Sequence, residues 1–171
     1  MSDPGKVGGL PYQDTKPYGA ADFYFAINAT FRFLIQRLGH EGWRRYLDEM
    51  AANYYRPVWT RWKQGGISAV ASYLRDFFAA EPGAETTVQA IGDSVVLDVH
   101  VCPAIKHLRE HGREIVPEFC QHCYFQGEGM ASRAGMAMRL EGGAGSCRQT
   151  FYADPVGVPE QDMAKIRRVS A

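Results

Sequence analysis

The residues best suited to chemistry are concentrated in the second half of the chain. All four cysteines lie beyond residue 100, at Cys102, Cys120, Cys123 and Cys147. A cysteine can serve as a nucleophile, a metal ligand, one half of a redox pair, or a small buried side chain. We therefore take these four thiols as the candidate centre of the protein, and we expect them to converge in one pocket.

Two of the cysteines are predicted to lie at helix N-termini. Pro103 suits the first position of a helix, so Cys102 is expected to cap that helix. Pro117 predicts the start of a second helix, running to about Gly129, with Cys120 in its first turn. The unpaired amides and partial positive charge of a helix N-terminus stabilise a thiolate and lower its pKa. This placement favours a nucleophile at Cys102 or Cys120.

Other roles for the thiols remain open at this point. Zinc accepts four thiolates, so Cys102, Cys120, Cys123 and Cys147 are an alternative ligand set, although only one pair is close in sequence. Cys120 and Cys123 also have the CxxC spacing of a redox dithiol, but without the βαβ context of that class. The thiols could also be small buried core residues. No cofactor is certain from these patterns, and zinc is one that they allow.

Several polar residues near the cysteines are candidates for substrate binding. Asp98 and His100 share one face of a predicted strand, where they could be acid–base partners or an exposed polar face. Arg148 could anchor a substrate carboxylate, although it faces away from Cys147 on the same strand. His122 is expected to point away from the thiols. His100 and Arg148 are therefore the predicted substrate-binding residues.

The first half of the chain is predicted to be a helical scaffold. Residues 1–20 are rich in glycine and proline and predict a flexible N-terminal arm. Apolar residues at helical spacing predict helices over about residues 22–38, 43–56 and 67–80. Because only a short turn separates the first two, they are expected to pack as an antiparallel pair.

After residue 85 the hydrophobic period changes from helical to two. Strands are predicted over residues 86–91 and 94–101 around a Gly-Asp turn, and over residues 136–140 and 147–152 around a glycine-rich turn. The predicted fold is a single α+β domain over residues 21–155. N-terminal helices pack on a roughly four-stranded antiparallel sheet, two further helices lie between the hairpins, and residues 156–171 form a C-terminal tail.

Composition narrows the class of partner. Lys plus Arg and Asp plus Glu are equal at 19 each, so net charge gives no support for binding nucleic acid or a membrane. No apolar run is long enough to span a bilayer, and the first residues lack the apolar core of a signal peptide. We expect a cytoplasmic protein with reduced thiols and a small-molecule substrate. The oligomeric state is not determined by the sequence.

The order and spacing of these motifs resemble a known family. The chain begins with a helical half that is rich in aromatic residues. A strand ending in Cys102-Pro103 follows it, then Phe119-Cys120 on a helix, and then a glycine-rich turn with Cys147 before a final strand. Over roughly residues 20–152 this pattern is similar to the L-2-amino-thiazoline-4-carboxylic acid hydrolase family. An acidic residue often stands in that family where this chain has Cys123, a departure that bears on the substrate.

The resemblance implies a hydrolase that opens a small cyclic C–N or C–S substrate with a cysteine-centred site. A thiolate, or a zinc-bound hydroxide held by cysteines, could attack the amidine-like carbon of such a ring. A more distant similarity is to small-molecule-binding domains related to four-vinyl reductase. That similarity implies the alternative, a non-catalytic sensor of a small molecule or metal.

Overall fold

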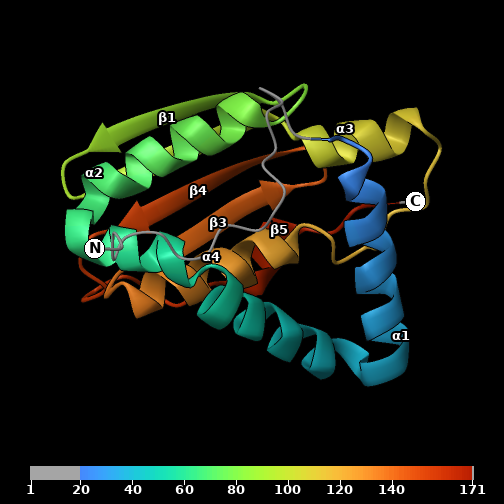
Figure 1. The fold of residues 1–171 in the computed structure, drawn as a ribbon, viewed down its shortest axis with the longest axis horizontal. Coiled ribbons are helices and arrows are strands. Elements are labelled where there is room, and N and C mark those ends of the chain that lie inside the picture. Colours follow the sequence, from blue (N-terminus) through green and yellow to red (C-terminus); the bar gives the residue numbers. More distant parts are fainter. Residues whose placement is uncertain (1–19, 171) are drawn as a thin grey trace, which may run out of the picture.

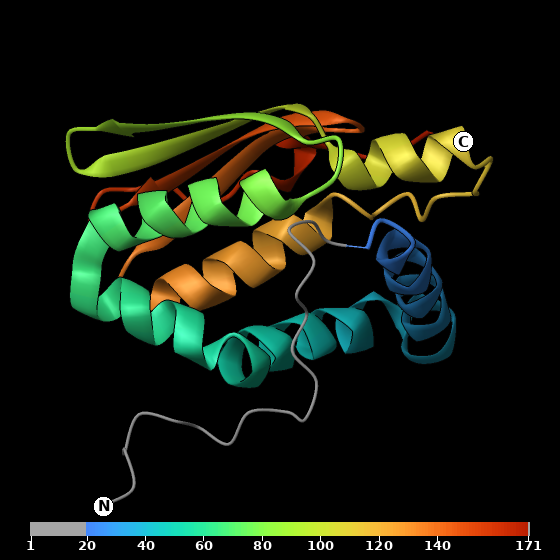
Figure 2. The same ribbon diagram turned by 45° about the horizontal axis from the view of Figure 1, so that its top comes forward.

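The structure is a computed structural model that describes residues 20–170. The predicted N-terminal arm, residues 1–20, therefore lies outside the described residues except for its last position. Three layers stack on one another (Figures 1 and 2). The sheet is the first layer, α2 (Arg56–Ala80) and α4 (Gln121–Arg133) cover one of its faces, and part of α1 (Phe23–Glu49) packs beneath α4. This is the α+β class that the sequence predicts.

The helix α1 changes direction at Gly39. The φ of 68° and ψ of 179° at this residue are not helical, and a positive φ favours glycine because it has no Cβ. Figure 1 shows the two arms of α1 meeting at a corner. The predicted break after Leu38 is confirmed, but the predicted antiparallel packing of the first two helices is wrong. A kink at a single residue redirects the chain and leaves no loop in which it could reverse.

A π-helical turn, Met50–Tyr54, connects α1 to α2. Pro57 lies in the first turn of α2, where its missing N–H removes no helical hydrogen bond. The predicted helix over residues 67–80 is the second part of α2, which has a second kink at Gly66. Within residues 20–170, no helix has the length and apolar character that crossing a membrane requires.

The sheet has the order β1-β2-β4-β3-β5, and its first four strands pair antiparallel in two hairpins joined through β2 and β4. These strands are β1 (Glu85–Ile91), β2 (Ser94–Val101), β3 (Ala137–Gly143) and β4 (Ser146–Tyr152). Both hairpins are confirmed. The helix α3 (Pro103–Glu110) begins as predicted, with Cys102 as its N-cap. The helix α4 begins at Gln121 rather than at Pro117, so Cys120 is its N-cap and not a residue of its first turn.

The C-terminal segment is part of the fold and not only a tail. After a short 3-10 helix (Met163–Lys165), β5 (Ile166–Arg167) pairs parallel to β3 at the edge of the sheet. Ile166 and Val169 are each 3% exposed, and the Val169 N–H donates to the Pro117 carbonyl. The segment therefore closes the sheet edge and holds the loop that leads into α4.

Two clusters of buried side chains lie inside the molecule. One fills the space between the sheet, α2 and α4, and includes Trp62, Val70, Leu97, Met138 and Phe151. The other joins α1 to α3 and to the segment before α4, and includes Phe31, Trp43, Leu47, Leu108 and Phe119. Cys102 and Cys120 pack against both clusters. The predicted active centre therefore lies at the junction between the two cores.

The close approach of β5 to the hairpin turn predicts a large penalty for a side chain at Gly143. Its φ is 132°, and an added Cβ would lie 2.6 Å from the Arg167 carbonyl oxygen and 3.3 Å from the Cys120 Cβ. We expect Gly143→Ala to lower the free energy of unfolding by about 2–4 kcal/mol, as measured by urea denaturation. Gly157→Ala is the matched control, since Gly157 has a φ of 77° and open space around it. It should cost only about 1–2 kcal/mol, and equal losses would contradict the steric account.

Candidate functional site

The turn between β3 and β4 brings the cysteine-bearing elements together. The Ala144 N–H donates to the Cys120 sulfur at 3.1 Å, and the Arg109 Nη1 donates to the Ala144 carbonyl at 3.0 Å. The Cys102 N–H donates to the Gly145 carbonyl at 2.8 Å. One turn therefore fixes the end of β2, the start of α4 and the side of α3 relative to one another.

All four thiols occupy this region, and each is partly buried. Cys147 lies on β4 opposite Gly142, where an added Cβ would lie 3.0 Å from the Cys147 Cα. Cys123 lies in the first turn of α4. A negative charge on Cys123 would raise the pKa of each of the other three thiols, so Cys102, Cys120 and Cys147 all lie near it. The four thiols therefore lie close enough to one another to interact electrostatically.

Burial, and not the helix N-termini, dominates the acidity of these thiols. The backbone N–H groups of Ala104 and Ile105 lower the pKa of Cys102, as a helix start should, but desolvation outweighs them and raises it to about 12. Desolvation likewise raises the pKa of Cys123 to about 12, and it raises that of Cys147 as well. The expectation of a lowered thiol pKa at the helix starts is therefore wrong.

Cys120 has the least raised pKa of the four thiols, at about 11. Desolvation and the nearby Cys123 raise it, whereas the Ala144 N–H and the guanidinium groups of Arg109 and Arg167 lower it. Among the cysteines, the environment of Cys120 is therefore the one most able to stabilise negative charge on sulfur.

His122 interacts with the cysteine cluster, contrary to the expected direction of its side chain. Its Nδ1 bonds the Phe119 carbonyl and must donate there, because a carbonyl only accepts. Burial lowers the pKa of His122 to about 4, so the ring is neutral and Nε2 is an acceptor. The Cys123 sulfur lies 3.5 Å from that nitrogen. Helical spacing predicts that the side chains of His122 and Cys123 leave α4 on different sides. The imidazole is nevertheless long enough to reach the neighbouring thiol.

The described residues do not form a ready metal site. Within residues 20–170, no group of three or more His, Cys, Asp and Glu side chains has an arrangement that could hold a metal ion. The zinc alternative, with Cys102, Cys120, Cys123 and Cys147 as ligands, therefore does not fit this arrangement.

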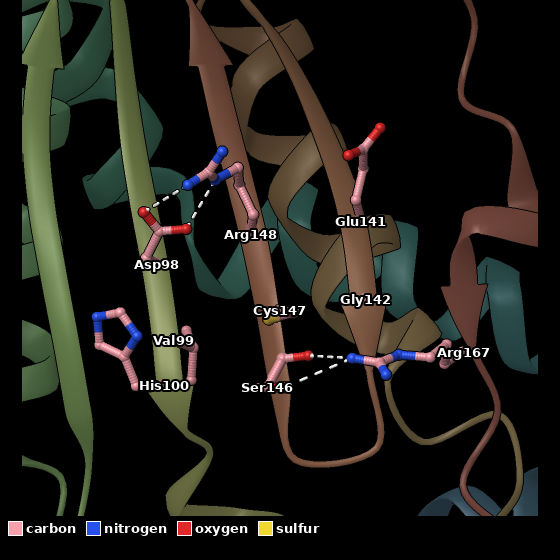
Figure 3. Close-up of a pocket in the computed structure, with 9 residues that line it drawn as sticks. All are labelled: Asp98, Val99, His100, Glu141, Gly142, Ser146, Cys147, Arg148 and Arg167. Carbon is pink, nitrogen blue, oxygen red and sulfur yellow. Dashed lines mark hydrogen bonds and ion pairs between the residues drawn. The ribbon is translucent and has the colours of Figure 1, made fainter.

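The predicted substrate-binding residues lie on the opposite face of the sheet. A shallow pocket of about 470 Å³ there is lined by residues that include His100, Arg148 and Arg167 (Figure 3). Arg148 binds both carboxylate oxygens of Asp98, at 2.7 and 3.0 Å, and lowers the pKa of that carboxyl group. His100 Nε2 lies 2.9 Å from the Thr87 hydroxyl. Asp98 and His100 thus bond different partners, and the Arg148 guanidinium is paired with Asp98.

Comparison with protein-family models, with curated proteins and with solved structures finds no match for this chain.

The raised thiol pKa values predict slow alkylation of the native protein at neutral pH. A thiol with a pKa of about 11 is ionised roughly 100-fold less at pH 7.5 than an ordinary one. We expect iodoacetamide to modify all four cysteines at least about 100-fold more slowly than in the unfolded chain. As the pH rises, Cys120 should be modified first, which peptide mass spectrometry can resolve. Fast labelling of any one cysteine at pH 7.5 would contradict this account.

The same shifts predict that stability falls in alkali. In the unfolded chain a thiol ionises near 9.0, whereas folded Cys123 holds its proton to about 12. Between these values the folded state binds more protons, so the free energy of unfolding decreases as pH rises. Cys123→Ala should lower stability at pH 8 but make the decrease from pH 9 to 11 shallower than in the wild type, as measured by urea denaturation. An unchanged slope would show that Cys123 does not contribute.

Proposed function

We propose that this protein is a hydrolase that opens a small cyclic amidine of the 2-aminothiazoline carboxylate type, with Cys120 as the nucleophile. The observation that supports this most directly is the environment of the Cys120 sulfur. It accepts a backbone N–H at 3.1 Å, lies near two guanidinium groups, and is partly exposed to solvent. A nucleophile needs such stabilisation of developing charge.

A neutral thiol suits a substrate that carries its own base. The Cys120 sulfur bonds to the amidine carbon while its proton passes to the ring nitrogen, so the C=N double bond becomes single. The ring C–S bond then breaks, and the departing sulfur takes a proton from the amino nitrogen. Water replaces the Cys120 sulfur on that carbon. This step regenerates the thiol and leaves a carbamoyl product with a free thiol group.

The other residues of the cluster take supporting roles in this proposal. Cys123 and His122 form a neutral pair in which the imidazole Nε2 can accept a proton from sulfur. Cys102 and Cys147 are neutral and partly buried. In such a partly buried site a thiolate and a protonated amidine attract each other more strongly than in water. Pairing with the substrate cation would then offset the desolvation that holds Cys120 protonated.

A second candidate function is a non-catalytic small-molecule sensor. The raised pKa of all four thiols favours it, because protonated thiols are poor nucleophiles. A sensor would bind the cyclic amidine without converting it. The two functions differ in one measurable product, the thiol released by ring opening.

Turnover of L-2-amino-2-thiazoline-4-carboxylate is the test, followed as the appearance of free thiol with a chromogenic disulfide. We expect turnover by the wild type and a loss of at least about 1000-fold in Cys120→Ser, since a hydroxyl ionises far less readily than a thiol. Stability should change by only about 1–3 kcal/mol. Cys147→Ser makes the same atomic exchange in the same cluster and should retain measurable turnover.

Mass spectrometry of wild-type protein quenched in acid during turnover provides the second readout. The proposal expects a covalent adduct on the peptide that contains Cys120 and on no other cysteine-containing peptide. An adduct on Cys123 would transfer the nucleophilic role to the Cys123–His122 pair. Ligand-induced stabilisation without released thiol would support the sensor instead.

A further inference from the structure

We propose that the shallow pocket on the face of the sheet opposite α2 and α4 binds a phosphate group, and that Arg167, Ser146 and His100 are its ligands. The pocket has a volume of about 470 Å³ and is lined by residues of β2, β3, β4 and β5 (Figure 3). The site goes beyond the proposed function, because none of its three ligands belongs to the cysteine cluster.

The three ligands lie along one row across the sheet. Ser146 pairs with Gly143, and Gly143 pairs with Arg167. His100 continues the row on the other side of Ser146, as the register between β2 and β4 requires. Neighbouring strands are about 4.8 Å apart, so the backbones of His100 and Arg167 are separated by about 14 Å. Side chains that extend inward from both ends of this span leave space for one small group above Ser146.

Arg167 reaches the pocket across β3. Because Gly143 has no side chain, the guanidinium lies over that strand, and its Nη2 donates to the carbonyl and hydroxyl oxygens of Ser146 at 3.3 and 3.4 Å (Figure 3). These bonds use one of the guanidinium nitrogens, so other N–H groups of Arg167 can bind a ligand. The arginine and the hydroxyl are therefore already directed at the same point.

Charge pairing leaves one cation of the pocket available for an anion. The Asp98 carboxylate is bonded at both oxygens by Arg148, and the Glu141 carboxylate is bonded by Lys165 at 2.6 Å. Within residues 20–170, no carboxylate forms an ion pair with Arg167. The two acidic residues of the pocket are thus neutralised, and the Arg167 charge is not.

His100 supplies a donor from the side opposite Arg167. Its Nε2 lies 2.9 Å from the Thr87 hydroxyl, which can donate to that nitrogen. The proton of a neutral imidazole is then on Nδ1, where it can be donated to a ligand. Protonation of the ring would add a positive charge and favour an anion further.

A phosphate group matches these donors better than a carboxylate does. Its oxygens point in tetrahedral directions, whereas both oxygens of a carboxylate lie in one plane. Arg167 and His100 approach from two sides and the Ser146 hydroxyl from the sheet below, so a phosphate can accept hydrogen bonds from all three. Because the pocket is shallow, the substituent of a phosphate monoester can extend from it into solvent.

An NMR titration of the isotope-labelled full chain tests the site with three probes at one ionic strength: inorganic phosphate, methyl phosphate and acetate. We expect both phosphates to bind at millimolar concentration and to shift the amide signals of Ser146 and Arg167. Acetate should bind at least about 10-fold more weakly.

Three substitutions of exposed side chains give the site a signature in affinity. Arg167→Gln should weaken phosphate binding at least about 10-fold, and Ser146→Ala should weaken it about 3-fold. Glu141→Gln should instead tighten binding about 2-fold or more, because it removes a negative charge from the pocket and releases Lys165 from its ion pair. A gain of affinity cannot result from a loss of folding.

Arg45→Gln is the matched control, because it removes the same charge from an exposed arginine on α1 and should leave phosphate affinity unchanged. The proposal is overturned if the wild type binds no phosphate at millimolar concentration, or if Arg45→Gln loses as much affinity as Arg167→Gln. Acetate that binds as tightly as phosphate also overturns it. Absence of ring opening with phosphate binding retained would reject the hydrolase and keep this site.

Discussion

The hydrogen bond from the Ala144 N–H to the Cys120 sulfur is the contact on which the arrangement of the site depends. It joins the β3–β4 turn, which belongs to the sheet, to the start of α4, which belongs to the helical layer. Arg109 and Cys102 bond the same turn from α3 and from the end of β2. Because four elements meet there, the thiols keep fixed relative positions although they come from distant parts of the chain.

Glycine makes this meeting point sterically feasible. Cβ atoms at Gly142 and Gly143 would collide with the backbones of β4 and β5. Without side chains at these positions, Cys147 can pair opposite Gly142 within the hairpin, and Cys120 can approach Gly143 from α4. The two-residue strand β5 then closes the open side of β3. The C-terminal segment therefore supports the site without contributing a nucleophile.

Electrostatics in this region are controlled by desolvation. Backbone amides favour negative charge on Cys102 and Cys120, but burial and the neighbouring thiols oppose it more strongly. The resting thiols are consequently neutral. A protein of this kind would gain most from a ligand that brings positive charge, since the cation offsets the desolvation of a thiolate. The opposite face of the sheet differs, because most of its charges are paired with one another, as Arg148 is with Asp98.

The sequence by itself determined the local structure. The alternation of apolar and polar residues and the Gly92-Asp93 turn specified the first hairpin. Pro103 specified the start of α3, with Cys102 as its N-cap. The break at Gly39 was also local, because only the backbone freedom of glycine is involved. Such signals depend on residues close in sequence, and patterns of hydrophobicity and turn chemistry encode them directly.

Only the tertiary structure decided how these elements pack against one another and how acidic the thiols are. The direction of the chain after Gly39 is set by packing, and β5 is too short to have a detectable period. The acidity of Cys120, the reach of His122 to Cys123, and the pairing of Tyr24 with Glu81 all depend on neighbours distant in sequence or on burial. Desolvation is a property of the assembled interior, so no spacing of cysteines along the chain could reveal that the thiols would stay protonated.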